Sequence, residues 1–270
     1  MRRLAPPAVA VAAAVVAALT VCQPPAAATE VTFELAPFGT LTVYHAAARP
    51  AHVALFVSGD GGWKLGVVDM ARELAAMDAL VVGIDITHYV KTVVSGAAAA
   101  SDACFDPARD FEQLGKAVEQ RFGYAGWTPP ILVGYSSGAT LVYAALVQAP
   151  PRTFAGAVSL GFCPDLIVNM PICKGNGLTW ARDPHHKGVD FLPSRLLEVP
   201  WIALQGDIDK ICTPADTRAY VAKVPHGELV WLHKVGHGFS VPRHWMPELK
   251  ASFARVARGA RAAAAAGAAQ

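Results

Sequence analysis

A strand-like segment, a glycine-flanked serine and a helix-like segment follow one another in the middle of this chain. Residues 130–133 are apolar and β-prone, residues 134–138 read Gly-Tyr-Ser-Ser-Gly, and residues 139–146 are small and apolar at helical spacing. A strand, a sharp turn and a helix in this order form an elbow that raises a serine hydroxyl above a sheet, and the strained turn tolerates only glycine two residues to either side. The segment predicts an α/β fold with Ser136 as a nucleophile, and a purely structural turn is the alternative.

The remaining segments alternate between strand-like and helix-like patterns, which is typical of a mostly parallel sheet covered by helices. The hydrophobic content of 53% and the charged content of 16% are sufficient for one large core. We therefore predict a single α/β domain over residues 29–258, with helices on both faces of the sheet. The expected strands are 31–35 and 41–45, which form an antiparallel pair, and then 53–57, 79–84, 130–133, 154–160, 201–205 and 229–232; the expected helices are 65–77, 105–122, 139–146 and 214–224.

Two segments interrupt this alternation, and both follow a strand. Residues 87–101 are rich in alanine and glycine, and residues 162–195 contain prolines, glycines and two cysteines. Insertions after strands build the substrate pockets of α/β enzymes, because they lie at the carboxyl edge of the sheet. We predict that residues 162–195, after the sixth strand, form a lid over Ser136 that a disulfide ties internally. Residues 259–270 are an alanine-rich, low-complexity tail, expected to be a frayed helix end.

The first 28 residues have the pattern of a secretory signal peptide. Two arginines near the start precede a short apolar run, and an alanine-rich segment ends at Ala28, where cleavage is expected. The prolines at positions 24 and 25 interrupt the apolar run and disfavour a membrane anchor. Cys22 offers a lipoprotein site as a secondary alternative, although Val21 is large for the residue before a lipidated cysteine. The expected location is therefore the periplasm or the exterior.

Export would leave four cysteines in the mature chain, Cys104, Cys163, Cys173 and Cys212. An even number in an oxidising compartment predicts two disulfides, and three connectivities are possible. A bond between Cys163 and Cys173 would close a short loop and leave Cys104 to pair with Cys212. The usual spacings of zinc ligands do not occur, so we expect no metal and no organic cofactor.

The charge of the mature chain disfavours nucleic acid as a partner. The formal net charge of the whole chain is +2, and loss of the two arginines in the signal peptide would reduce it to zero. A neutral protein has no general attraction for a phosphate backbone.

Candidates for a base and an acid follow the serine in the order used by α/β hydrolases. His237 lies between two glycines just beyond the strand at 229–232, and His233 is a weaker candidate at the end of that strand. Asp207 and Asp209 both follow the strand at 201–205, and the spacing from the preceding glycine favours Asp209. Asp207 would then brace the loop by accepting backbone hydrogen bonds. We predict a triad of Ser136, Asp209 and His237.

The glycine-rich segment at residues 58–63, Ser-Gly-Asp-Gly-Gly-Trp, is the candidate for half of an oxyanion hole. Glycines let the backbone approach a tetrahedral oxygen closely, and Asp60 occupies the usual donor position. The second donor is the backbone N–H of Ser137. A phosphate-binding loop is disfavoured because no Gly-Lys-Ser/Thr follows.

The chain resembles the AcvB/VirJ family of bacterial periplasmic virulence-associated α/β hydrolases. The resemblance rests on residues 58–63, on residues 134–139 and on the Asp209 loop with Cys212 and Pro214, and it covers about residues 50–255. It implies an α/β-hydrolase fold and periplasmic hydrolysis of lysyl-phosphatidylglycerol, which would release the amino acid from the lipid headgroup. Some members of the family are instead linked to type IV secretion and protein contacts. This chain departs from the family at Thr140, where members often carry aspartate, and in its cysteine-containing insertion.

The implied substrate suggests which further residues contact it. The lysyl ammonium would need a carboxylate, which Asp60, Asp85 or Asp165 could supply, and the phosphate could meet His185, His186 or Lys187. Trp63 is a further substrate-binding candidate in the glycine loop. The expected partners are thus a lipid or small ester and the membrane surface. A general carboxylesterase and a non-catalytic, secretion-associated binding protein are the two alternatives.

Overall fold

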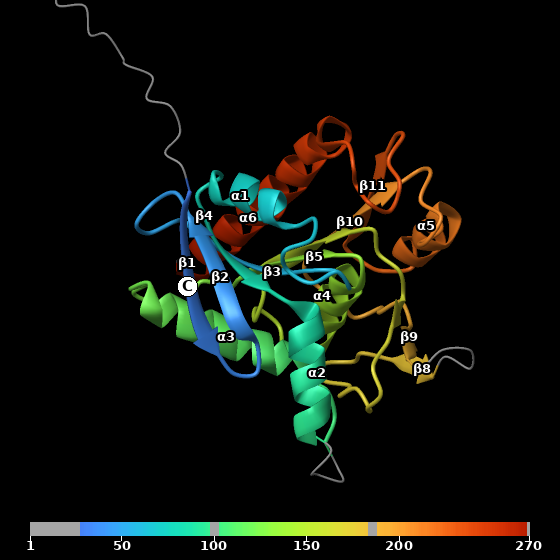
Figure 1. The fold of residues 1–270 in the computed structure, drawn as a ribbon, viewed down its shortest axis with the longest axis horizontal. Coiled ribbons are helices and arrows are strands. Elements are labelled where there is room, and N and C mark those ends of the chain that lie inside the picture. Colours follow the sequence, from blue (N-terminus) through green and yellow to red (C-terminus); the bar gives the residue numbers. More distant parts are fainter. Residues whose placement is uncertain (1–27, 98–102, 183–187, 269–270) are drawn as a thin grey trace, which may run out of the picture.

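An eight-stranded sheet forms the centre of the molecule in the computed structural model, which describes residues 28–97, 103–182 and 188–268 (Figure 1). The strand order is β1-β2-β4-β3-β5-β6-β10-β11; β1 and β2 are antiparallel to each other, β2 is antiparallel to β4, and the other pairs are parallel. The strands are β1 (Thr29–Leu35), β2 (Gly39–His45), β3 (His52–Val57), β4 (Ala79–Ile84), β5 (Ile131–Tyr135), β6 (Gly156–Leu160), β10 (Trp201–Gly206) and β11 (Gly227–Leu232). The predicted mostly parallel sheet is confirmed.

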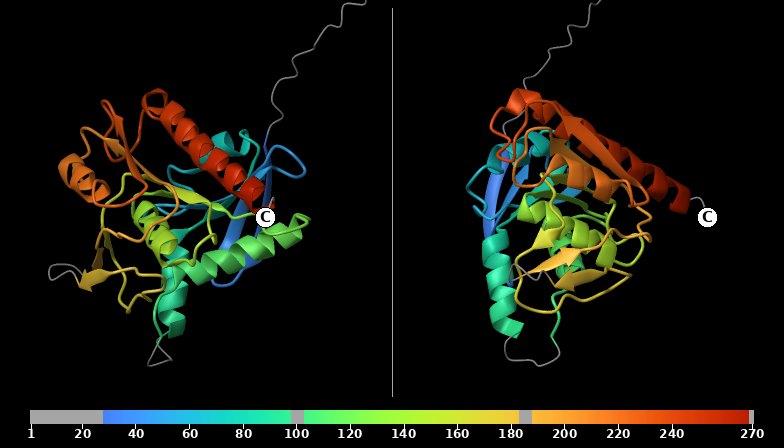
Figure 2. Two further views of the ribbon diagram at one scale, coloured as in Figure 1. Left: turned by 180° about the vertical axis from the view of Figure 1, so that it is seen from behind. Right: turned by 90° about the vertical axis from the view of Figure 1, so that its right-hand side faces the viewer.

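Helices cover both faces of this sheet, because its central strands are apolar on both sides. In β3, Leu55 and Val57 pack in one core with α3 (Pro107–Arg121) and α4 (Ser137–Gln148). Phe56 packs in a second core with α1 (Val68–Ala75) and α6 (Met246–Ala268). Figure 2 shows α6 running diagonally across the face seen from behind. The helices are α1 (Val68–Ala75), α2 (Ile86–Ala97), α3 (Pro107–Arg121), α4 (Ser137–Gln148), α5 (Pro214–Val221) and α6 (Met246–Ala268), with a short 3₁₀ turn at Pro242–His244.

Two helices differ from the sequence prediction. The segment predicted as an insertion from residue 87 forms α2, because Ile86 and Tyr89 are buried against the core and Asp85 accepts the first free N–H groups of the helix. Helix α6 continues through the alanine-rich segment to Ala268, as the high helix propensity of alanine allows. Among the helices of the described residues, none combines the length and the apolar character needed to cross a bilayer.

The insertion after β6 contacts α4 near both ends of the insertion. Its described residues include the short strands β7 (Asp165–Leu166), β8 (Trp180–Arg182) and β9 (Val189–Phe191), arranged in the order β7-β9-β8. The backbone N–H of Ser194 donates to the Tyr143 hydroxyl at 2.9 Å, and the Thr140 hydroxyl donates to the Cys163 carbonyl at 2.6 Å. Leu166 and Phe191 are buried in the core that contains α4. These contacts make the insertion an integral part of the domain.

The two disulfides among the described residues join Cys104 to Cys173 and Cys163 to Cys212. The prediction of a disulfide within the insertion is therefore wrong. The reason lies in the sheet: β6 and β10 are adjacent and parallel, so the loop after β6, which contains Cys163, meets the loop after β10, which contains Cys212. Two structural disulfides are typical of exported proteins.

Glu119 on α3 makes stability depend on pH. The residue is 4% exposed, its carboxyl oxygens accept the N–H of Thr128 at 3.1 and 3.2 Å, and burial raises its pKa from 4.5 to about 7. The folded protein therefore holds this proton more tightly than the unfolded chain does, and stability falls as the pH rises from 4.5 to 7. We expect the free energy of unfolding to fall by about 2–3 kcal/mol less between pH 4.5 and pH 8 in Glu119→Gln than in the wild type. Urea unfolding at the two pH values measures this difference.

The matched control is Glu112→Gln on the same helix, whose side chain is 33% exposed beside Lys116. We expect it to change the free energy of unfolding by less than about 0.5 kcal/mol at either pH, because an ion pair between exposed side chains four residues apart on a helix contributes little. An unaltered decline in Glu119→Gln would show that other groups cause it.

Candidate active site

The turn between β5 and α4 holds Ser136 in a strained conformation, with φ 55° and ψ −125°. A Cβ atom on Gly134 would lie 2.2 Å from the Gly138 carbonyl oxygen, and one on Gly138 would lie 2.3 Å from the Ser58 carbonyl oxygen. Both positions therefore require glycine. The arrangement of strand, turn and helix predicted from the sequence is confirmed.

Ser136 begins a chain of hydrogen bonds to two loops that follow neighbouring strands. Its Oγ lies 2.9 Å from Nε2 of His237, beyond β11, and Nδ1 of His237 lies 2.9 Å from Oδ2 of Asp209, beyond β10. The His237 side chain is 17% exposed and the Asp209 side chain is fully buried. This geometry lets His237 take a proton from Ser136 while Asp209 orients its ring.

The structure brings Asp209, not Asp207, to the histidine. Oδ1 of Asp209 accepts the backbone N–H groups of Ile211 and Cys212 at 2.8 and 3.0 Å. Burial opposes ionisation of Asp209, but hydrogen bonds from His237 and from these N–H groups hold its pKa below the usual value. The carboxylate is therefore the form present at neutral pH.

Asp207 braces the neighbouring turn. Its Oδ1 accepts the backbone N–H of Lys234 at 2.7 Å, and its Oδ2 lies 2.8 Å from Nδ1 of His233. The His233 side chain is 76% exposed. This pair lies apart from the hydrogen-bond chain of Ser136.

Tyr135 supports the histidine loop, and the sequence analysis did not identify it. Its hydroxyl donates to the His237 carbonyl oxygen at 3.0 Å, and its ring lies 5.9 Å from the His237 ring. Tyr135 occupies the variable position before the serine, where side-chain type alone carries no signal.

The glycine loop after β3 lies against the serine. A Cβ atom on Gly59 would be 3.1 Å from Cβ of Ser136, and the N–H of Gly62 closes a turn on the Gly59 carbonyl at 2.9 Å. Asp60 is exposed at the start of this turn, and Ser137 is the first residue of α4. The two predicted oxyanion donors, the N–H groups of Asp60 and Ser137, thus belong to the glycine loop that contacts Ser136 and to the helix that follows it.

Two predicted substrate contacts have structural roles instead. The Trp63 side chain is 7% exposed, and its Nε1 donates to the Tyr44 hydroxyl at 3.2 Å. Asp85 accepts hydrogen bonds from the N–H groups of Trp63, Thr87 and His88 and from the Thr87 hydroxyl, and these bonds lower its pKa against the effect of burial. Trp63 is thus packed in the core, and the Asp85 carboxylate is hydrogen-bonded to N–H groups of the loop and of the helix. Asp165 is exposed at the start of β7. The candidates His185, His186 and Lys187 lie outside the described residues, as does Cys22.

Asp209, Cys212 and His237 also place three possible metal-ligand atoms within 4.8 Å of one another. However, the sulfur of Cys212 is bonded to Cys163 and cannot act as a thiolate ligand. The residues present do not fit a metal centre.

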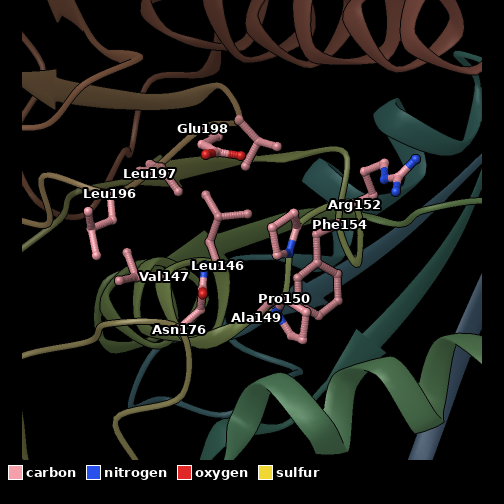
Figure 3. A pocket seen from close by; sticks show the side chains of 12 residues that line it. Leu146, Val147, Ala149, Pro150, Arg152, Phe154, Asn176, Leu196, Leu197 and Glu198 are labelled. Atoms are coloured by element: carbon pink, nitrogen blue, oxygen red, sulfur yellow. The ribbon is translucent and has the colours of Figure 1, made fainter. Parts of the chain in front are cut away.

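A small cavity lies at the opposite end of α4 from Ser136 (Figure 3). Its lining includes Leu146, Phe154 and Leu197, and its volume is about 30 Å³. This is room for about one water molecule, so the cavity is too small for a substrate.

Comparisons with known proteins agree with this fold. Residues 51–160 match the model of a family described as bacterial virulence protein (VirJ), which confirms the predicted resemblance for the segment that contains the glycine loop and the elbow. The esterase domain of a Rhodothermus marinus protein is 16% identical, with a TM-score of 0.55 over 86% of this chain and 98% of that chain. A predicted CIB-like hydrolase from Thermoplasma acidophilum is 13% identical, with a TM-score of 0.51 over 87% and 99%. The chain thus has the α/β-hydrolase fold. No curated protein matches its sequence.

Proposed function

We propose that this protein, which is similar over residues 51–160 to the VirJ family of bacterial virulence proteins, is a serine hydrolase that cleaves an ester. The observation that carries the proposal is the hydrogen-bond chain from Ser136 through His237 to the buried Asp209. A serine at a strained elbow, a base and an acid in this geometry are the parts that acyl transfer requires.

The reaction would proceed through an acyl-enzyme. Ser136 Oγ attacks the ester carbonyl while His237 Nε2 takes its proton, and His237 then returns that proton to the leaving alcohol. His237 then takes a proton from water, whose oxygen attacks the acyl carbonyl, and returns that proton to Ser136 Oγ as the acyl group leaves as a carboxylic acid. The backbone N–H groups of Ser137 and Asp60 would stabilise the negative oxygen of each tetrahedral intermediate.

The substrate proposed is the aminoacyl ester of lysyl-phosphatidylglycerol or of a related aminoacylated lipid. The family resemblance supports this choice, and so do the exposed apolar side chains of Ile208 (58%) and Ile211 (69%) on either side of Asp209. Asp60, exposed directly after Gly59, is the candidate carboxylate for the lysyl ammonium, because Asp85 is occupied by four hydrogen-bond donors.

The proposed location is the periplasm, reached after cleavage of residues 1–28. The two disulfides support export, since such bonds persist in oxidising compartments. Contact with the membrane surface would bring the enzyme to a lipid substrate, and a secretion-system partner is a further proposal from the resemblance.

The test compares lysyl-phosphatidylglycerol vesicles with a nitrophenyl ester, using the purified protein. We expect lysine release to be faster than nitrophenol release. We also expect Asp60→Asn to raise KM about tenfold for the lysyl lipid alone, as for the loss of one charged contact, whereas Asp69→Asn on α1, whose side chain is 88% exposed beside Arg72, has no effect. Cleavage of the nitrophenyl ester alone would indicate a general carboxylesterase. Lack of activity on both would favour a non-catalytic binding protein.

A further inference from the structure

The orientation of the Asp209 carboxylate depends on the backbone at residues 211 and 212. Oδ1 accepts both N–H groups of this segment, and the same carboxylate presents Oδ2 to His237. A displacement of the segment would therefore rotate or withdraw Oδ2 from the histidine. We use the name acid loop for residues 207–213.

The acid loop bonds the end of β11 and the segment after it through its first residues, from the N–H of Asp207 to the Leu232 carbonyl and from the N–H of Ile208 to the Val235 carbonyl, and two of its side chains lie in solvent. Ile208 and Ile211 are 58% and 69% exposed, whereas Cys212 is 4% exposed. Besides the hydrogen bond from its N–H to Asp209, Cys212 has a disulfide to Cys163 and accepts a hydrogen bond from Nε2 of Gln205 at its carbonyl, at 2.9 Å. The disulfide is the covalent link of Cys212 to the rest of the domain.

The other end of this disulfide leads to the helix of the nucleophile. The Cys163 carbonyl accepts the hydroxyl of Thr140 at 2.6 Å, and Thr140 is fully buried in the first turn of α4, which begins directly after Ser136. Gly161, two residues before Cys163, lies against His237, because a Cβ atom there would be 3.2 Å from its ring. Each of six residues thus contacts the next, and the last contacts the first. In order they are Ser136, Thr140, Cys163, Cys212, Asp209 and His237.

We propose that the Cys163–Cys212 disulfide, held by Thr140, is a positioning element that keeps Asp209 in register with His237 and Ser136. This inference rests on the proposed serine hydrolase function. The second disulfide supplies a comparison: Cys104–Cys173 connects the start of α3 to the insertion, and Gln148 at the far end of α4 donates to the Cys173 carbonyl at 2.6 Å.

The first test replaces each disulfide in turn by alanines. We expect Cys163→Ala/Cys212→Ala to lower kcat for the nitrophenyl ester about 10²-fold, because misplacement of about 1 Å costs that much, while KM stays within about threefold. Cys104→Ala/Cys173→Ala should keep kcat within about threefold. All rates are measured well below the unfolding temperature of each variant, so that a loss of stability alone does not lower them.

A double-mutant cycle with Asp209→Ala separates positioning from general support of the fold. If the disulfide acts through Asp209, its removal in the Asp209→Ala protein should change kcat by less than about threefold. Substitution of Thr140 provides a second test of the proposal, and it leaves both disulfides intact. Thr140→Val should lower kcat about fivefold, since it removes the hydrogen bond that the Cys163 carbonyl accepts, and Thr140→Ser should retain the wild-type rate within about twofold.

Equal losses of kcat in the two disulfide variants, or additive losses with Asp209→Ala, would overturn the inference. If the alanine variant at Cys163 and Cys212 does not fold, the comparison of Thr140→Val with Thr140→Ser decides, and equal rates in these two would overturn it. A wild-type protein that neither turns over the ester nor reacts with a fluorophosphonate would refute the proposed function itself. An active wild type with an unaffected disulfide variant would refute the inference alone.

Discussion

Replacing Ser136 with alanine is expected to lower ester hydrolysis about 10⁶-fold and to abolish covalent labelling by a fluorophosphonate. In the proposed reaction this hydroxyl attacks the ester, and its Oγ lies 2.9 Å from Nε2 of His237, which would take its proton. Alanine keeps the Cβ atom and removes only this oxygen. The measurements are steady-state hydrolysis of a nitrophenyl ester and the mass of the protein after treatment with the probe.

Two controls isolate chemistry from folding. The thermal unfolding midpoint of Ser136→Ala should match that of the wild type, and urea-unfolded wild-type protein should not react with the probe, because the elbow and the base are then separated. A probe adduct that persists in Ser136→Ala would show that another residue is the nucleophile.

Replacing Asp209 with asparagine is expected to lower kcat about 10⁴-fold. Asp209 Oδ2 lies 2.9 Å from His237 Nδ1, and an amide there can hold the imidazole in the tautomer that cannot accept the serine proton at Nε2. It also removes the negative charge that stabilises the imidazolium formed during attack. The measurement is kcat for the nitrophenyl ester at neutral pH, where the depressed pKa of Asp209 keeps the wild-type carboxylate ionised.

Asp207→Asn is the matched control, because it makes the same chemical change two residues away. Asp207 bonds His233 and the N–H of Lys234, so we expect kcat to change by less than about threefold. Comparable losses in the two variants would indicate that the loop as a whole, and not the carboxylate of Asp209, supports the reaction.

Local patterns were sufficient to predict most of the strands and the elbow. The fully buried runs of β3 and β4 are continuous apolar segments, and Asp106 with Pro107 marks the start of α3, where the Asp106 side chain accepts the N–H of Arg109 at 3.1 Å. Helix α2 was missed because its β-branched residues and the glycine near its end give a weak local helix signal, which the burial of Tyr89 outweighs.

By itself, the sequence determined the α/β architecture, the position of Ser136 and the order of the candidate acid and base, because these depend on residues within a few positions of one another. Only the tertiary structure decided that Asp209 and not Asp207 meets His237, and that Cys163 pairs with Cys212. The choice between Asp207 and Asp209, which share one loop, depends on the backbone N–H groups that hold each carboxylate. The pairing of the cysteines depends on which loops come together at the carboxyl edge of the sheet. The order β5-β6-β10-β11 places those loops side by side, and strand order is a property of contacts between residues far apart in the chain.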